Sequence, residues 1–204
     1  LYAISRQKST ICCDRAKSII SSFMKEINEL EEAPKLYYSP QFGELVYKDQ
    51  NNEMALSKLS AGYQSLLWMI MDLAYRVCLL NPELQDKFDI KGIVLIDEID
   101  MHLHPKWQWN IIKALRATFA NVQFIIATHS PIVISSSKEA NLILLDEKRQ
   151  AVYLPDCYGY TVEDVLRYRL ESAGRPKDID ALINKTEEAL EEEKFEDAKA
   201  VWGN

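Results

Sequence analysis

The sequence has little glycine, no closely spaced cysteine pair and no long hydrophobic run. Only six of its 204 residues are glycine, at positions 43, 62, 92, 159, 174 and 203, and none lies in a GxxxxGK(S/T) segment that could cradle a phosphate. The four cysteines show no C-x-x-C spacing, which favours reduced thiols and a cytoplasmic location. No apolar run approaches the ~20 residues that span a bilayer, and no signal peptide is visible. The printed residues therefore contain neither a phosphate loop nor a membrane segment.

The charge balance is acidic. The chain has 31 acidic and 24 basic residues, which gives a formal net charge of −7. It therefore has no overall basic field of the kind that attracts nucleic acid. The net charge does not exclude a local basic patch. Hydrophobic residues make up 48% and charged residues 27%, as in an ordinary globular protein. The length fits one domain, or one domain with an appendage. Because the sequence opens at Leu1 inside a helical pattern, we expect the complete chain to begin upstream.

The first 80 residues predict helix, β structure and helix in turn. Apolar residues recur at helical spacing over residues 1–33, and Pro34 ends the pattern. This helix is either one arm of a helical hairpin or a packing helix, and a packing helix is favoured. β-formers and a turn cluster occupy residues 35–56. Residues 57–80 lead into an apolar helix, for which Ser60 is a good N-cap.

The centre of the sequence is an apolar run followed by two acids. The unbroken run over residues 93–96 predicts a strand buried on both faces of a parallel sheet. Asp97 and Glu98 follow at the carboxyl end of this strand, where open α/β sheets bind their ligands. One carboxylate near a metal and one on an attacking water would suit a magnesium-nucleotide site. The alternative is a solvated acidic turn.

The second half of the sequence continues the α/β pattern. Pro105 sits at a favoured first-turn position of a helix, and residues 122–127 predict a second buried strand. Strand, crossover helix and strand over about 35 residues form a βαβ unit, so the sheet is partly parallel. Residues 141–145 and 150–154 predict two further strands. From Thr161, which caps a helix start, the chain is helical and polar.

Three stretches resemble known nucleotide-binding motifs in their order and spacing. They are LSAGYQ at residues 59–64, IVLIDE at 93–98 and ATHSP at 127–131. Together they resemble the C-terminal half of an ABC-type ATPase head, in the branch that includes SMC, RecF and OLD-like proteins. HLHP at 102–105, with Trp107-Gln108 after it, resembles AAA-family ATPases of bacterial defence systems, such as the PtuA ATPases of Septu and retron-associated anti-phage systems. The resemblance covers about residues 55–160.

The first stretch resembles the signature segment of this family. A hydroxyl and a glycine at a helix N-terminus favour an anion, because free N–H groups and the helix dipole point at it. In the family, the signature contacts the γ-phosphate of an ATP bound to the opposite protomer. The residues to which the resemblance assigns this role are Ser60, Ala61, Gly62 and Gln64.

The other stretches match the family's hydrolytic residues. Asp97 matches the magnesium-associated Walker B aspartate, and Glu98 matches the general base that orients the hydrolytic water. His129 matches the switch histidine that reads the γ-phosphate. His104 falls near the D-loop, which touches the partner's site. Two positions depart from the usual pattern, Ile99 in place of proline and Asp100 in place of Glu or Thr, and neither is a metal or base position.

The resemblance also implies a fold class and a domain organisation. The class is α/β, an ABC-ATPase-like P-loop head with a partly parallel sheet and flanking helices. Residues 1–34 form a helical segment, residues 35–160 the C-terminal half of the head, and residues 161–204 a helical extension that includes the acidic stretch 187–199. That stretch is either a solvated helix face or, as the less favoured interpretation, an acidic docking surface.

The implied function is ATP hydrolysis in an anti-phage defence complex. Two copies, or a higher homo-oligomer, sandwich ATP and Mg²⁺, and hydrolysis controls an associated HNH-type nuclease. Contact with DNA or other nucleic acid runs through the complex, and no membrane is involved. Because a phosphate loop is lacking here, activity belongs to the full-length dimer. The alternatives are a nucleotide-sensing dimerisation module with little hydrolysis and a DNA-repair ATPase of the RecF or SMC kind.

A metallohydrolase is the remaining alternative. His102 and His104 form an H-x-H pair with carboxylates nearby in the sequence, and such residues could ligate a metal. The carboxylates that would complete this cluster are Asp97, Glu98 and Asp100.

Overall fold

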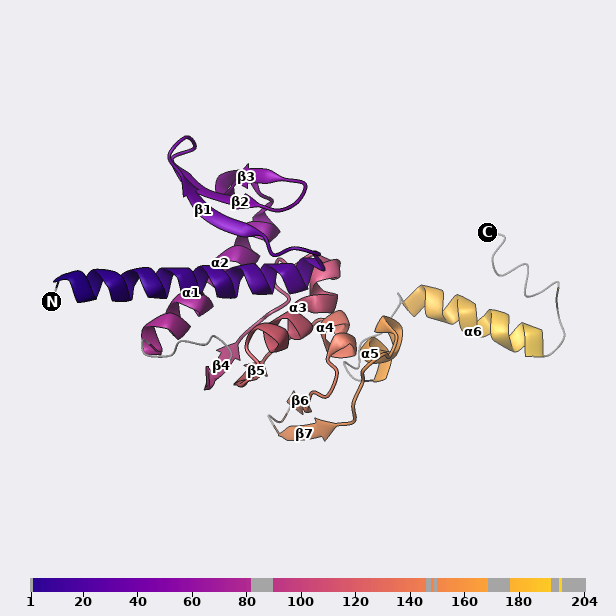
Figure 1. Cartoon of the computed structure of the whole chain (residues 1–204). Helices are drawn as coiled ribbons and strands as arrows, with labels where there is room; N and C mark the ends of the chain where they lie inside the picture. Colours follow the sequence, from indigo (N-terminus) through magenta and orange to yellow (C-terminus); the bar gives the residue numbers. More distant parts are fainter. Residues whose placement is uncertain are drawn as a thin grey trace. The chain divides into compact units, whose positions relative to one another are not determined.

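The computed structural model describes residues 2–81, 90–145, 148, 150–168, 177–191 and 195, and it divides into two units, residues 1–158 and 159–204 (Figure 1). The larger unit opens with a long helix and a three-stranded sheet and continues with a βαβ unit. Its elements are α1 (Tyr2–Asn28), β1 (Lys35–Ser39), β2 (Glu44–Lys48), β3 (Glu53–Ala55), η1 (Leu56–Lys58), α2 (Ala61–Leu80), β4 (Gly92–Ile96), α3 (Pro105–Thr118), β5 (Val122–Ile126), α4 (Pro131–Ser136), β6 (Leu142–Leu145) and β7 (Ala151–Leu154).

The core of this unit forms where α1 packs against both α2 and α3. Figure 1 shows α1 with the β1–β3 sheet on one side and α3 on the other. The apolar positions predicted from helical spacing supply the buried side chains, since one face of each helix turns inward. The fully buried members include Phe23, Ile27, Leu67, Ile70, Ile111 and Leu115. The packing-helix interpretation of the first segment therefore fits the observed contacts.

The end of α1 differs from the sequence prediction. The helix ends at Asn28, not at residue 33, because Glu29 turns into the left-handed region with φ 55°. The Leu30 N–H then donates to the Lys25 carbonyl at 3.0 Å, which closes the last turn as in a Schellman motif. Pro34 lies beyond this closure and does not set the helix end.

The β1–β3 sheet is an antiparallel meander that fixes the approach to α2. Tyr47 of β2 is buried with its ring 5.2 Å from the ring of Tyr63 in α2, and burial raises the pKa of the Tyr47 phenol. The Glu44 carboxylate accepts hydrogen bonds from the Ser57 hydroxyl at 2.7 Å and the Ser57 N–H at 3.0 Å. These bonds lower the pKa of Glu44 and hold η1, which directly precedes the signature segment.

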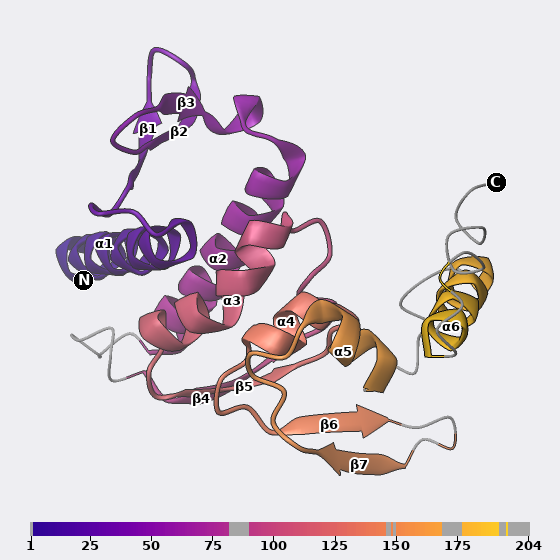
Figure 2. The same ribbon diagram turned by 90° about the vertical axis from the view of Figure 1, so that its right-hand side faces the viewer.

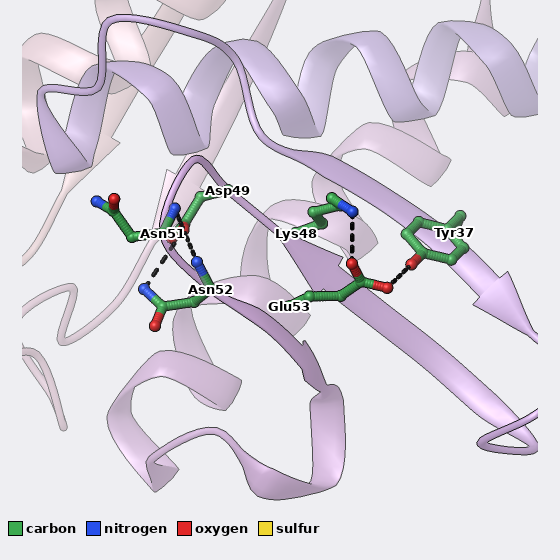
Figure 3. Close-up of polar contacts among 6 residues, drawn as sticks. All are labelled: Tyr37, Lys48, Asp49, Asn51, Asn52 and Glu53. Atoms are coloured by element: carbon green, nitrogen blue, oxygen red, sulfur yellow. Dashed lines mark hydrogen bonds and ion pairs between the residues drawn. The ribbon is translucent and has the colours of Figure 1, made fainter.

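The β2–β3 hairpin carries an exposed polar network (Figure 3). The Asp49 carboxylate accepts from the N–H groups of Asn51 and Asn52 and shapes the turn. The Glu53 carboxylate accepts from both Lys48 and Tyr37. Hydrogen bonding from Lys48, and then from Tyr37, lowers the pKa of Glu53.

This network makes the hairpin pH-sensitive in a defined direction. The pKa of Glu53 is lower in the folded chain than in the unfolded chain. The stabilisation that the Glu53 carboxylate gives to the folded state is therefore present above the unfolded pKa and is lost as the pH falls through the folded pKa. An NMR titration of the Glu53 carboxyl should give a lower midpoint in the folded chain than in urea. Lys48→Met should move the folded midpoint upward. Identical midpoints in the two states would contradict the network.

The central βαβ unit is confirmed. Strands β4 and β5 pair in parallel, with Gly92 opposite Val122 and Ile96 opposite Ile126, and α3 forms the crossover. Pro105 occupies the first turn of α3, as predicted. The short helix α4, capped by Ser130, was not predicted from the sequence.

The prediction that the central strand is buried on both faces is wrong. Ile96 packs against the helical core and Val94 is half-buried, but Ile93 and Leu95 are 62% and 75% exposed. On the same face, Ile125 of β5 is 52% exposed. Within the described part of the chain only one face of the β4–β5 pair is covered, so an apolar run typical of a fully buried strand is left half uncovered.

Strands β6 and β7 form a separate antiparallel hairpin (Figure 2), and most of its predicted turn at 146–149 lies outside the described residues. The second unit contains α5 (Val162–Tyr168) and α6 (Lys177–Glu191). The Thr161 hydroxyl accepts from the Asp164 N–H at 3.1 Å and donates to its carboxylate at 2.6 Å, which confirms the predicted cap. The predicted acidic stretch 187–199 begins in the last turn of α6, and apart from Phe195 its part after Glu191 lies outside the described residues. No described helix is long and apolar enough to cross a membrane.

Candidate functional site

The signature segment forms the capped N-terminus of α2. Ser60 is the N-cap, and its hydroxyl accepts from the Tyr63 N–H at 3.3 Å, as the sequence predicted. The Gln64 side-chain amide donates to the Leu59 carbonyl at 2.8 Å, so it turns back toward the loop that precedes the helix. Ser60 and Ala61 are exposed at the start of the helix.

Gly62 lies against the turn that follows β4. A Cβ atom added to Gly62 would meet the carbonyl oxygen of His102 at 2.6 Å, a distance that no side chain tolerates. Glycine is therefore required here by a contact within the chain. His102 itself has a φ of 63°, and Leu103 beside it is buried and anchors the turn.

This contact brings two helix N-termini to one pocket. The pocket, about 540 Å³ in volume, is lined by residues that include Ser60, Gly62, His102, His104, Lys106 and Trp107. We call it the signature pocket. The starts of α2 and α3 both border it, and both helix dipoles favour an anion there. The sequence motifs identified Ser60, Gly62 and His104, whereas nothing in the motif pattern marked Lys106 as a lining residue.

His104 is the N-cap of α3. Its Nδ1 accepts from the Lys106 N–H at 3.2 Å, so this ring nitrogen is an acceptor in the cap. The imidazole ring also lies 6.2 Å from the ring of Trp107, in an edge-to-face arrangement. These contacts fix the His104 side chain at the N-terminus of α3, where it lines the signature pocket.

The two carboxylates lie at the end of β4, outside the lining of the signature pocket. Asp97 and Glu98 are exposed, and Glu98 has a φ of 48°. A left-handed conformation costs a residue other than glycine about 1–2 kcal/mol. The Met101 N–H, which donates to the Glu98 carbonyl at 2.9 Å, and the buried side chain of Ile99 hold this conformation.

His129 reaches the same edge of the sheet from β5. Pairing continues past the strands, with the Ala127 N–H donating to the Ile96 carbonyl at 2.9 Å and the Ile99 N–H to the Ala127 carbonyl at 3.3 Å. The loop that carries His129 therefore runs beside the loop that carries Asp97 and Glu98. The structure thus brings the three predicted residues to one edge, all exposed to solvent.

A polar network joins these loops to α3. The Thr128 hydroxyl donates to the Asp100 carboxylate and accepts from the Ser130 N–H at 3.0 Å. The Ser130 hydroxyl donates to the Gln108 side-chain oxygen at 2.7 Å, and the Gln108 amide donates to the Leu103 carbonyl at 3.0 Å. Sequence reasoning considered Asp100 only as a carboxylate of the alternative metal cluster and not as a link between loops. The structure shows that it ties the turn after β4 to the loop after β5.

The donor set at the sheet edge fits a magnesium ion that carries phosphates. Mg²⁺ prefers carboxylate oxygens and is usually held by one or two of them together with substrate phosphates and water. Asp97 and Glu98 offer exposed carboxylates of this kind. In the part of the chain that the structure describes, no three His, Cys, Asp or Glu side chains gather into a metal-binding group.

Comparisons with known proteins identify the family and the relatives of the chain. The AAA ATPase domain model matches residues 3–134. The chain is 35% identical over 176 residues to "Retron Vc95 probable ATPase" of Vibrio cholerae serotype O1 biovar El Tor, covering 82% of this chain and 33% of that protein. It is 34% identical over 155 residues to "Septu protein PtuA" of Bacillus mycoides (strain KBAB4), covering 74% of this chain and 20% of that protein. The chain therefore spans a third or less of the length of these two relatives.

The fold resembles that of SMC ATPases. A solved structure from work on ATP-driven dimerization and DNA-stimulated activation of SMC ATPases aligns with a TM-score of 0.53 at 14% identity, covering 82% of this chain and 95% of that one. The expected α/β class, a head with a parallel sheet and flanking helices, is thereby confirmed. Since the family model covers more than half of the sequence, the chain belongs to the AAA ATPase domain family.

Proposed function

We propose that this chain is part of the ATP-hydrolysing head of an anti-phage defence ATPase that works as an ATP-sandwich homodimer, or as a higher homo-oligomer. The family and the retron and Septu relatives support the defence role. The observation that carries the dimer is the division of the site. The lining of the signature pocket does not include Asp97, Glu98 or His129, which lie where β4 and β5 end.

In this proposal each nucleotide lies between two copies. One copy offers the carboxylate edge, and the other offers its signature pocket, where Ser60, Ala61, Gly62 and Gln64 form the capped start of α2. His104 borders the same pocket and contacts the nucleotide from the D-loop side. Phosphoryl transfer needs positioning and charge stabilisation more than covalent chemistry, and two helix N-termini supply both.

The carboxylate edge supplies the chemistry of hydrolysis. Asp97 holds Mg²⁺, which when bound offsets negative charge on the phosphates. Glu98 orients the attacking water and accepts its proton. His129, on the adjacent loop, hydrogen-bonds the γ-phosphate side of the nucleotide. The network through Asp100 and Thr128 keeps the two loops in register, so the base and the histidine keep their relative positions.

The output of hydrolysis in this proposal is control of an associated nuclease of the HNH type. Contact with DNA or other nucleic acid belongs to the assembled complex in the cytoplasm, since the acidic chain has no overall basic field. Hydrolysis belongs to the complete protein, in which a phosphate loop completes the nucleotide site.

Phosphate release by the full-length protein tests this function. Ser60→Arg places a bulky cation in the signature pocket and His129→Ala removes the switch histidine, so both should reduce ATP-dependent release at least about tenfold. Ser65→Arg is the matched control, because Ser65 is exposed on the same helix and is not a pocket residue. Equal release by wild type and Ser60→Arg would overturn the signature assignment. If the wild type releases no phosphate but its copies still associate when ATP is added, the protein is a nucleotide-sensing dimerisation module.

A further inference from the structure

The last residue of α1 joins three helices through one side chain. The Asn28 amide nitrogen donates to the Met24 carbonyl at 3.0 Å and to the Tyr63 hydroxyl of α2 at 3.3 Å. Its amide oxygen accepts from the Trp107 indole N–H of α3 at 3.0 Å. Asn28 therefore uses both ends of its amide, as a half-buried polar group must if its desolvation is to be offset.

The two aromatic partners occupy equivalent positions in the two helices whose first turns border the signature pocket. Tyr63 is the third residue of α2, directly after Gly62, and Trp107 is the third residue of α3 and lines the pocket. Their rings lie 5.2 Å apart at 78°, an edge-to-face pair. The Trp107 ring also lies 3.6 Å from the position that a Cβ on Gly62 would take. Asn28 thus bonds to the first turns of both helices that border the signature pocket.

No similar side chain reproduces this set of bonds. An aspartate could accept from the Trp107 indole but could donate to neither the Tyr63 hydroxyl nor the Met24 carbonyl. An alanine would leave the indole N–H and the tyrosine hydroxyl without this partner. Because α1 packs against both α2 and α3, its end is the natural place to fix the spacing between their first turns.

We propose that Asn28 is a positioning residue that sets the spacing between the first turns of α2 and α3, and so the shape of the signature pocket toward the phosphate of a nucleotide bound by a second copy. The inference rests on the proposed ATP-sandwich function. It predicts that Asn28 acts on the apparent affinity for ATP in the dimer, and not on the hydrolytic groups, which do not line the signature pocket.

Steady-state kinetics of the full-length protein test this role. Asn28→Asp and Trp107→Phe should each raise the KM for ATP, and the ATP concentration for half-maximal association, about tenfold while changing kcat less than twofold. The double variant Asn28→Ala/Trp107→Phe should raise the KM for ATP little more than either single change, because both changes remove the same hydrogen bond. The control is Asn110→Ala, since Asn110 also bridges α3 and α1, by donating to the Ile27 carbonyl at 3.4 Å, but is not a pocket residue.

The outcomes separate the two proposals. A wild type that neither hydrolyses ATP nor dimerises when ATP is added contradicts the proposed function. The positioning role, which rests on that function, is then contradicted as well. A responsive wild type whose Asn28 variants match Asn110→Ala in KM, at equal thermal stability, overturns the positioning role alone. A loss confined to kcat would also overturn it, because it would place Asn28 in the hydrolytic step.

Discussion

Replacing Glu98 by glutamine in the full-length protein is expected to lower kcat for ATP hydrolysis by about 10²–10⁴-fold. Glutamine has nearly the size of glutamate but cannot take a proton from the attacking water. ATP-driven association should persist, because the signature pocket is untouched, and the ATP-bound dimer should accumulate. Single-turnover phosphate release, together with light scattering of the eluted dimer, measures both effects.

The unusual backbone at Glu98 calls for a matched control. Glu29 is also an exposed glutamate in the left-handed region, with φ 55° compared with 48° for Glu98, but it lies at the end of α1, away from the carboxylate edge. Glu29→Gln should leave turnover unchanged, which would separate loss of the base from any effect of glutamine on such a turn. Normal turnover by Glu98→Gln would remove Glu98 from the role of general base.

Gly62→Ala is expected to cause the second large loss. The new methyl group would meet the His102 carbonyl oxygen at 2.6 Å, and since that atom is backbone, the turn itself must move. Overpacking of this kind costs about 1–3 kcal/mol of folding free energy. The shift would also displace His104 and open the signature pocket, so ATP-driven association should be lost. Urea unfolding and association assays measure the two effects separately.

Gly92→Ala provides the comparison for this change. A Cβ on Gly92 would meet no atom within 4 Å, so the same substitution there should be tolerated. If Gly62→Ala were as stable and as active as Gly92→Ala, the claim that the contact with the His102 carbonyl requires glycine at position 62 would be wrong. If stability were kept and association alone were lost, the glycine would be needed for the approach of the phosphate.

Local sequence signals predicted the elements of this fold well. The caps at Ser60 and Thr161 and the start of α3 at Pro105 depend on neighbours a few residues away, so the printed sequence contains their cause. The end of α1 was missed because a glutamate took the left-handed turn that usually marks a glycine. The burial of β4 was mispredicted because an apolar run does not reveal how many faces are covered.

The candidate site was predictable only in part. Motif order brought Asp97, Glu98 and His129 to one sheet edge, because parallel strands end together. The supporting bonds could not be inferred, since they join residues far apart in the chain. Asn28 and Trp107 are separated by 79 positions, and Asp100 and Thr128 by 28. Which polar side chains pair at such separations depends on the packed helices and not on spacing.

The uncovered face of the β4–β5 pair has a practical consequence for handling the protein. Ile93, Leu95 and Ile125 present adjacent apolar side chains to water, and such patches make copies adhere to one another. When this chain is prepared by itself, a lysine at position 95 would improve solubility without disturbing the helical core. In any assembly that covers this face, the same lysine would be buried and would destabilise the assembly. One substitution would thus report, by the sign of its effect, whether the face is covered.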